Sequence, residues 1–281
     1  MNRPAILPEL DGLRAVAAYG IVATHVAFQT ATGSAVLERF DYFVAVFFAL
    51  SAFLLARGGL REGYYGRRVS RLAPAYLVCV VVVLLALPPL AGVTWGQVAA
   101  NVLLAQIYVP HSLIDGLTQM WSLCVEAAFY LVLPLYLRLG SWGRHAALAG
   151  AVVLGLAWPW AVSGVTDPAV VNMQIWPPSY VPWFAVGLVL AELERAGVRY
   201  TGPRWPVAAL ALPVAWVGGV VGPRGLEHPS PLEFNVRVLL GALFATLVVA
   251  PFALGRRERG TVLSSRVMRT LGHWSYSVFL W

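Results

Sequence analysis

Long apolar runs alternate with short polar segments along the whole chain. A helix that crosses a bilayer needs about 20 mostly apolar residues. Runs of roughly that length predict eight transmembrane helices, over residues 13–30, 40–56, 73–93, 121–139, 146–163, 180–196, 205–222 and 234–254. A shorter run over 97–109 predicts a re-entrant or interfacial helix that returns to the side it came from. The pattern is typical of an all-α, polytopic membrane helix bundle.

A last apolar run begins near Thr270 and reaches Trp281. A helix of that length would extend about 18 Å, whereas the hydrocarbon core is about 30 Å thick. We therefore expect a truncated last span and a chain that is incomplete at its C-terminus. Because we find no internal repeat and no low-complexity linker, we expect residues 1–281 to form a single integral membrane domain.

The composition supports this class of protein. Hydrophobic residues make up 59% of the chain and charged residues 12%, whereas a soluble domain carries about 25% charged residues. These values exclude a disordered chain, a fibrous repeat and a disulfide-rich secreted scaffold. The two cysteines, Cys79 and Cys124, lie inside apolar runs, so we expect no disulfide between them.

The arginines predict the orientation of the helices. All 20 basic residues are arginine, and 17 of them fall in segments that are cytoplasmic if the N-terminus is cytoplasmic. Arg39, Arg224 and Arg237 are the remaining three, on the outer side. This asymmetry follows the positive-inside rule and predicts a multi-pass protein of the plasma or inner membrane. Since the arginines lie between apolar runs, we expect contact with the lipid bilayer and no nucleic-acid partner.

Ionisable residues in the first predicted span form a polar stripe. His25 lies eleven residues after Arg14, which places both within about 20° of one helix face and about 16 Å apart along the axis. Asp11 lies one turn before Arg14. Ionisable groups at membrane depth are costly and mark functional sites. The alternative is a structural histidine that packs between helices and bonds to a backbone carbonyl.

Glu126 is expected at the same depth as His25. It lies five residues inside the outer end of its span, and His25 lies five residues inside the outer end of the first span. A carboxylate beside a histidine fixes its tautomer and raises its basicity, so the pair is a candidate general base. The alternative is a water-facing glutamate that is stabilised by the helix dipole.

A cluster of arginines lies at the cytoplasmic mouth of the third predicted span, at Arg67, Arg68 and Arg71. The planar guanidinium group matches the geometry of phosphate oxygens. The alternative is a topological anchor that contacts lipid phosphate. The sequence lacks GxSxG, Walker, CxxC and HExxH motifs, and the outer loop 111–115 has no fixed ligand spacing, so we expect no metal site.

Five short segments, taken in their order along the chain, match the motifs of a known family. They are residues 10–15 followed by His25; 47–54; 67–76; 121–126 with Phe129, Tyr130 and Pro134; and 271–272 with 275–277 and 280–281. In this order and spacing the chain resembles the acyltransferase 3 family of multi-pass membrane O-acyltransferases. It departs from the family pattern at Ala52, where glycine is usual, and at Ala127 and Ala128, where polar residues are frequent.

The resemblance implies an acyl donor, usually acyl-CoA, and a hydroxyl acceptor, often on a sugar. It carries the family's functional positions over to five residues: Arg14, His25, Arg68, Arg71 and Glu126. It gives supporting positions to Asp11, Trp121, Ser122 and Tyr130. No permanently bound cofactor is implied, and acetyl-CoA serves as a co-substrate.

The hypothesis from the sequence is therefore a membrane O-acyltransferase that moves an acyl group, such as acetyl, from acyl-CoA to a carbohydrate or glycoconjugate hydroxyl. His25 would act as general base, oriented by Glu126, while Arg68 and Arg71 hold the CoA phosphates. Arg14 would contact phosphate or brace Asp11. A membrane transporter or flippase, and a degenerate family member without activity, remain the alternatives.

Overall fold

The computed structural model describes residues 7–86, 92–222, 228–256, 258 and 260–281. These residues form α-helices and short 3₁₀ helices, so the predicted all-α fold is confirmed. The α-helices are α1 (Pro8–Gln29), α2 (Phe43–Gly58), α3 (Tyr64–Ala86), α4 (Trp95–Val102), α5 (Trp121–Arg138), α6 (Ser141–Ala161), α7 (Val181–Arg195), α8 (Arg204–Ala209), α9 (Ala211–Val221), α10 (Pro231–Ala253) and α11 (Arg266–Leu280). The 3₁₀ helices are η1 (Leu37–Tyr42), η3 (Thr118–Met120), η4 (Met173–Ile175) and η5 (Pro177–Tyr180).

Each predicted apolar run contains helix, and most boundaries differ from the prediction by five residues or fewer, but three differences are larger. α3 begins at Tyr64 rather than 73, because the turn between the helices is completed by Gly59 and Gly63, both with positive φ. α4 ends at Val102, and Leu104 two residues later has a φ of 55° that a helix cannot continue. The predicted span 205–222 is divided at Leu210 into α8 and α9.

Five helical segments are long and apolar enough to cross a membrane: Leu37–Gly58, Tyr64–Ala86, Thr118–Arg138, Arg204–Val221 and Pro231–Ala253. The first, third and fourth of these combine a short helix with the α-helix that follows it. The predicted total of eight full spans is not confirmed by this measure and stays a prediction.

The chain divides into two compact units that are interleaved in sequence. The first unit comprises Met1–Gly59 with Pro182–Phe279, and the second comprises Leu60–Val181 with Leu280–Trp281. The first unit therefore holds α1, α2 and α8 to α10 with nearly all of α7 and α11, and the second unit holds α3 to α6. The prediction of one integral membrane domain stays a prediction.

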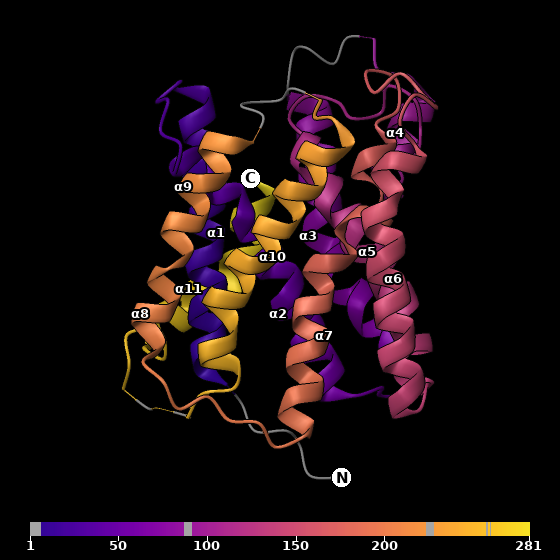
Figure 1. Ribbon diagram of the computed structural model, residues 1–281. Coiled ribbons are helices and arrows are strands. Elements are labelled where there is room, and N and C mark those ends of the chain that lie inside the picture. Colours follow the sequence, from indigo (N-terminus) through magenta and orange to yellow (C-terminus); the bar gives the residue numbers. More distant parts are fainter. Residues whose placement is uncertain (1–6, 87–91, 223–227, 257, 259) are drawn as a thin grey trace. The chain divides into compact units, whose positions relative to one another are not determined.

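In the first unit, α10 packs against α2 and α9, and α1 packs against α2 and η1. α8 and α9 follow one another along α10 (Figure 1). Close packing of α7 on α2 depends on Gly187, because a Cβ there would lie 2.1 Å from the Ala49 carbonyl oxygen. Nearby, the rings of Phe48 and Phe184 stack with centroids 4.3 Å apart. Small residues thus let these apolar helices approach at backbone distance.

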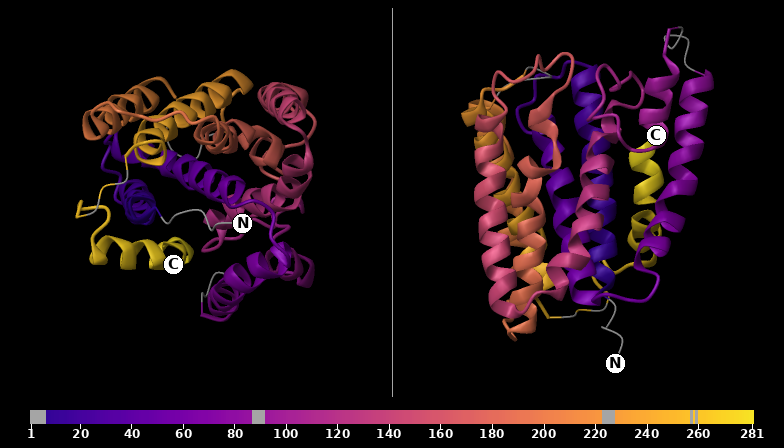
Figure 2. Two further views of the ribbon diagram at one scale, coloured as in Figure 1. Left: turned by 90° about the horizontal axis from the view of Figure 1, so that it is seen from below. Right: turned by 90° about the vertical axis from the view of Figure 1, so that its right-hand side faces the viewer.

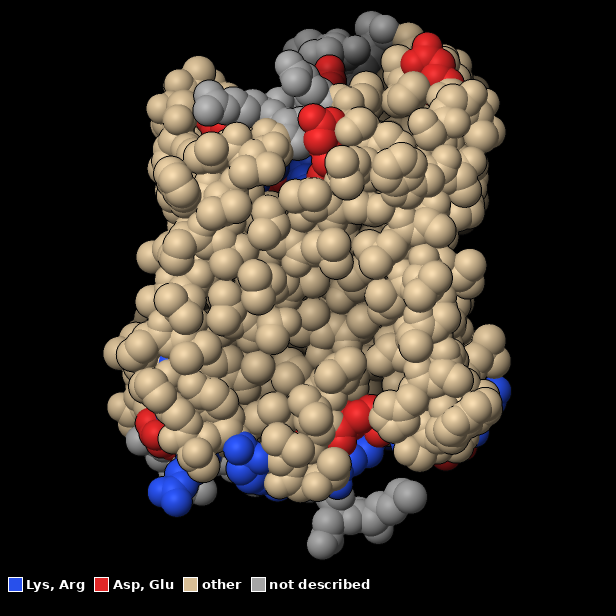
Figure 3. All heavy atoms as spheres, viewed as in Figure 1, with Lys and Arg blue, Asp and Glu red and all other residues tan. Residues whose placement is uncertain are grey.

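Several helix ends that carry arginine lie together at one end of the first unit. Arg57 at the end of α2 pairs with Glu194 of α7 at 2.7 Å, and Arg204 at the start of α8 pairs with Glu9 of α1 at 2.8 Å. The left panel of Figure 2 looks onto this end, and Figure 3 shows basic groups here below an uncharged surface of α8, α9 and α10. Arg3, Arg224, Arg257 and Arg259 lie outside the described residues.

In the second unit, α5 packs against α3 and α6, and η5 packs against α5 and α6. The Tyr65 hydroxyl at the start of α3 donates to the carbonyl oxygen of Leu131, in the middle of α5, at 3.3 Å. Gly155 on α6 admits the Pro178 carbonyl of η5, since a Cβ there would lie 2.5 Å from that oxygen. The right panel of Figure 2 shows α3 as one long helix.

The predicted orientation can be tested with single cysteines at two exposed positions, Ser70 on α3 and Thr166 after α6. We expect Ser70→Cys to resist an impermeant thiol reagent in intact cells and Thr166→Cys to react, because they are predicted on the cytoplasmic and outer sides. Permeabilised cells should allow both to react. The reverse pattern in intact cells would overturn the predicted orientation.

Candidate active site

The polar stripe of the first span lies on one unbroken helix. α1 continues from Pro8 to Gln29, so Asp11, Arg14 and His25 keep the helical spacing expected from the sequence. The Arg14 guanidinium lies 3.5 Å from the Asp11 carboxylate, and both side chains are partly buried. His25, three turns further along, is exposed on the surface of the protein. The stripe thus combines a braced cation near one end of the helix with an accessible imidazole near the other.

α11 supports the Asp11 end of this stripe. A Cβ at Gly272 would lie 2.0 Å from the Asp11 carbonyl oxygen, so only glycine permits the observed approach of α11 to α1. Gly12 has the equivalent role toward Leu263, because a Cβ at Gly12 would lie 2.2 Å from the Leu263 carbonyl oxygen. The final sequence motif therefore has a structural role beside Asp11 and Arg14, since it lets a second helix fix the position of the stripe.

A charged cluster near His25 was missed by the sequence analysis. Asp41 pairs with Arg39 at 3.6 Å and also with Arg237 of α10. The guanidinium of Arg39 is buried and donates to the Gly218 carbonyl oxygen at 3.0 Å. The Asp41 carboxylate acts electrostatically on the His25 imidazole. The only available signal in the sequence was Asp41 itself, an acidic residue within an apolar run.

In the second unit, Glu126 has a partner on its own helix. The Tyr130 hydroxyl donates to the Glu126 carboxylate at 2.5 Å, across one turn of α5. Tyr130 is buried and Glu126 is partly buried. The supporting role that the resemblance assigns to Tyr130 stays a prediction. A short hydrogen bond from a phenol holds the carboxylate in one orientation.

Tyr64, a residue that the sequence analysis did not select, lies within electrostatic reach of Arg68 and Glu126. Both charged groups act electrostatically on the Tyr64 side chain, which lies at the first position of α3. Within the described residues, the buried Tyr64 hydroxyl makes no hydrogen bond. Tyr64 was missed because the sequence predicted loop, rather than helix, before residue 73.

The other predicted residues of this unit lie at helix starts. Arg68 is partly buried and Arg71 exposed, one turn apart on α3. Trp121 begins α5, and its ring lies 4.8 Å from that of Tyr180. The buried Ser122 hydroxyl donates to the Gln119 carbonyl oxygen at 3.3 Å. Trp121 and Ser122 therefore fix the start of α5, four to five residues before Glu126.

The predicted residues form two sets. Asp11, Arg14 and His25 belong to the first unit, while Arg68, Arg71 and Glu126 belong to the second. The pairing of His25 with Glu126 therefore stays a prediction. Among the described residues, no three His, Cys, Asp or Glu side chains are grouped so that they could hold a metal ion.

Comparison with known proteins gives the family. The model of the Acyltransferase domain matches residues 7–281. Acyltransferase MdmB of Streptomyces mycarofaciens is 31% identical, over 98% of this chain and 77% of that protein. Peptidoglycan O-acetyltransferase OatA of Listeria monocytogenes is 23% identical, over 98% of this chain and 48% of that protein. O-acetyltransferase OatA of Staphylococcus aureus is 30% identical, over 48% of this chain and 25% of that protein.

The chain thus spans about half or less of the two OatA proteins, and most of the Streptomyces relative. No solved structure matches. The match of the family model is nearly complete along the chain, and the apolar helices agree with a membrane protein. The chain therefore belongs to the acyltransferase 3 family and is a membrane O-acyltransferase, an enzyme that transfers acyl groups.

Proposed function

We propose that the protein transfers an acyl group, in the simplest case acetyl, from acyl-CoA to a hydroxyl of a carbohydrate or glycoconjugate. The observation that carries this proposal is the polar stripe of α1, which runs from the braced Arg14 to the exposed His25 along one helix face. The stripe extends about 16 Å. A stripe of that length suits a long donor such as acyl-CoA, whose phosphates would lie near Arg14 while its thioester meets the acceptor hydroxyl at His25.

In the proposed reaction, His25 accepts the proton of the acceptor hydroxyl as its oxygen attacks the thioester carbonyl carbon. The new C–O bond forms, the C–S bond of the donor breaks, and the CoA thiolate leaves and takes up a proton. A positioned general base contributes about 10²–10⁴-fold to such a reaction. Asp41 lies in the same unit as His25, and its carboxylate acts electrostatically on the imidazole. Glu126, held by Tyr130, is the proposed orienting carboxylate.

The donor site is proposed at the start of α3. Arg68 and Arg71 lie one turn apart there and present two guanidinium groups that match phosphate oxygens of CoA. Arg14 is proposed as a further phosphate contact or as the brace of Asp11. These arginines lie in segments that the positive-inside rule places in the cytoplasm, where acyl-CoA is made. The N-terminus is accordingly proposed to be cytoplasmic.

A glycan acceptor is supported by the name of one relative, which describes acetylation of peptidoglycan. Glycan acceptors of that kind lie outside the cell membrane. The proposed arrangement therefore has the donor on the cytoplasmic side and the acceptor on the outer side, with His25 near the outer end of the first span. The protein would act within the plasma or inner membrane as a multi-pass enzyme.

The proposal can be tested with purified protein and radiolabelled acetyl-CoA, by measuring release of CoA and transfer of label to cell-envelope glycans. We expect Arg68→Lys to raise KM for acetyl-CoA about tenfold or more, because lysine keeps the charge but loses the bidentate fork. Arg67→Lys is the matched control, since Arg67 is exposed and donates to the Glu62 carbonyl.

We expect the control variant to keep the KM of the unmodified protein. No release of CoA above background by well-folded protein would contradict an acyl-CoA donor. Equal tolerance of lysine at both positions would show that Arg68 is a topological anchor rather than a phosphate ligand.

A further inference from the structure

Three charged residues of the first unit lie together where the positive-inside rule predicts few arginines. Arg39 and Asp41 belong to η1 and Arg237 belongs to α10, and all three lie in segments long and apolar enough to cross a membrane. The predicted orientation places both arginines toward the outer side, so topology does not account for them. Ionisable groups in such segments are costly and mark functional sites. We call these three residues the outer charged cluster.

The packing of α9 against η1 fixes the buried part of the outer charged cluster. The buried Arg39 donates from Nε to the Gly218 carbonyl oxygen at 3.0 Å. A Cβ at Gly218 would lie 2.3 Å from the Tyr42 hydroxyl oxygen, so only glycine lets α9 approach η1 this closely. The Asp41 carboxylate pairs with Arg39 at 3.6 Å and also with Arg237. The cluster is thus a preformed part of the fold.

Arg237 is the accessible member of the outer charged cluster. Its side chain is 30% exposed, compared with 16% for Asp41 and 4% for Arg39. The guanidinium group carries five N–H donors in one plane, and the hydrogen bond to Asp41 uses its Nη2 atom. Figure 3 shows a basic group recessed beside acidic groups near the upper end of the uncharged surface of α9 and α10. Arg237 can therefore contact a ligand while it stays paired with Asp41.

The outer charged cluster lies close to His25. η1 packs against α1 and α10, and these two helices also pack against each other. The hydroxyl of Thr24, the residue before His25, donates to the Glu38 carbonyl oxygen at 2.9 Å. Glu38 lies one 3₁₀ turn before Asp41 on η1. The Asp41 carboxylate acts electrostatically on the His25 imidazole. Asp41 is therefore a common neighbour of His25 and Arg237.

The charges around Arg237 favour a neutral ligand that is rich in oxygen. A guanidinium group only donates hydrogen bonds, so it binds oxygen atoms of a ligand. Asp41 already compensates its charge, and Glu233 lies one turn earlier on α10, so an anionic ligand gains little attraction here. Adjacent hydroxyl groups of a carbohydrate ring present pairs of oxygen atoms to the planar donors. A carbohydrate therefore fits the chemistry of this position.

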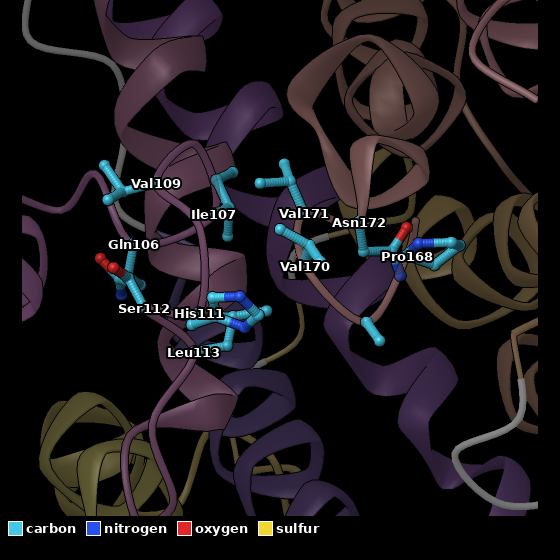
Figure 4. A pocket seen from close by; sticks show the side chains of 11 residues that line it. Gln106, Ile107, Val109, His111, Ser112, Leu113, Pro168, Val170, Val171 and Asn172 are labelled. Carbon is cyan, nitrogen blue, oxygen red and sulfur yellow. The ribbon is translucent and has the colours of Figure 1, made fainter. Parts of the chain in front are cut away.

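A small cavity of the second unit offers no comparable site. Its volume is about 70 Å³, and it lies between the segment after α4 and the segment before η4 (Figure 4). The residues that line it include no arginine, aspartate or glutamate, and most of them are aliphatic. The buried amide of Gln106 does not face it. A hydroxylated ligand would find no charged donor there that corresponds to Arg237.

We propose that Arg237 is the acceptor-binding residue of the enzyme, whose guanidinium donates to hydroxyl oxygens of a neutral carbohydrate while the reacting hydroxyl reaches His25. Asp41 and Arg39 are positioning residues, because they hold the guanidinium without contacting the acceptor. The assignment as an acceptor site rests on the proposed function, whereas the binding of a carbohydrate at Arg237 does not. The acceptor enters from the predicted outer side.

Binding can be tested without acyl transfer, through a thiol at the position of His25. Val26→Cys is the matched control for His25→Cys, because Val26 is exposed but lies about 200° around α1 from Thr24, which faces η1. The native Cys79 and Cys124 are 0% and 2% exposed and give little background labelling. The probe is methyl glucoside, with the protein in a zwitterionic detergent, because maltoside detergents carry glycoside head groups of their own.

We expect methyl glucoside to slow maleimide labelling of His25→Cys severalfold and to leave Val26→Cys unchanged. Adding Arg237→Lys should abolish the protection, because lysine keeps the charge beside Asp41 but loses the planar donors. Its unfolding temperature should stay close to that of the unmodified protein. Adding Glu233→Gln instead should leave the protection intact. Protection that persists in Arg237→Lys, or no protection of His25→Cys, would overturn the proposal.

The activity assay separates this inference from the proposed function. With a glycan acceptor, Arg237→Lys should raise KM for the acceptor about tenfold, the loss of one hydrogen bond from a charged donor, with KM for acetyl-CoA unchanged. Acyl transfer with an unchanged KM for the acceptor would keep the proposed function and overturn the acceptor site. Protection that depends on Arg237, without any acyl transfer by the unmodified protein, would keep the carbohydrate site and contradict the proposed function.

Discussion

Replacing His25 by glutamine is expected to lower the rate of acyl transfer by at least about 100-fold, the lower end of the contribution of a general base. Glutamine retains hydrogen-bonding groups of similar reach but has no nitrogen that can take up the proton of the acceptor hydroxyl. His25 is exposed on α1, so the substitution should not disturb packing. The measurement is the single-turnover rate of label transfer from acetyl-CoA, together with KM for the donor, which should be unchanged.

A second histidine provides the matched control. His145 is exposed on α6, and its ring nitrogen Nδ1 lies 2.8 Å from the Ser141 carbonyl oxygen. It therefore represents the structural alternative that the sequence left open for His25, a histidine bonded to a backbone carbonyl. His145→Gln should keep full activity. Near-normal turnover by folded His25→Gln protein would remove His25 from the mechanism and assign it the same structural role.

The part of the fold that the sequence predicts well is local. The apolar runs give the helices because burial in lipid requires every backbone group to be bonded within its own helix. The relation of Asp11, Arg14 and His25 also follows from the sequence, because 100° per residue fixes which side chains share a face. The contact of Tyr130 with Glu126 is local in the same sense, since the two residues are four positions apart.

The residues that sequence analysis missed depend on contacts between distant segments. Asp41 and Arg237 lie 196 positions apart in sequence, and neither has a local pattern that indicates the other. Gln106 occurs in an apolar run, where the sequence gives no sign of how a single amide is packed. Only the packed structure shows that its amide is buried and makes no hydrogen bond within the described residues.

The start of α3 shows a different reason for failure. The hydropathy window placed the boundary at residue 73, where the apolar run begins, because arginine is costly in lipid. The helix begins nine residues earlier, since the arginines and the leucine before residue 73 favour helix once the turn at Gly63 is complete. The span and the helix are therefore different lengths. This difference places Tyr64 and Arg68 on one helix at the proposed donor site.

Replacing Glu9 by alanine is expected to give the largest loss of stability of the substitutions considered. Glu9 is 5% exposed, and its carboxylate accepts from Arg204 at 2.8 Å and from the Thr261 hydroxyl at 2.9 Å. It thus joins the start of α1 to the start of α8 and to the segment before α11. The Arg204 side chain is only 10% exposed. Without Glu9, the buried guanidinium of Arg204 keeps only the more exposed Glu258 as an acidic partner.

Breaking a buried ion pair from one side costs about 3–5 kcal/mol, and we expect about 3 kcal/mol for Glu9→Ala because Glu258 still pairs with Arg204. Glu258→Ala is the matched control, since it removes a carboxylate from the same arginine at a position that is 55% exposed. An exposed pair contributes about 0–1 kcal/mol. Thermal unfolding in detergent should therefore show a much lower midpoint for Glu9→Ala than for Glu258→Ala. Equal shifts would mean that burial does not strengthen the Glu9 pair, and that α1 and α8 are held at this end by apolar packing alone.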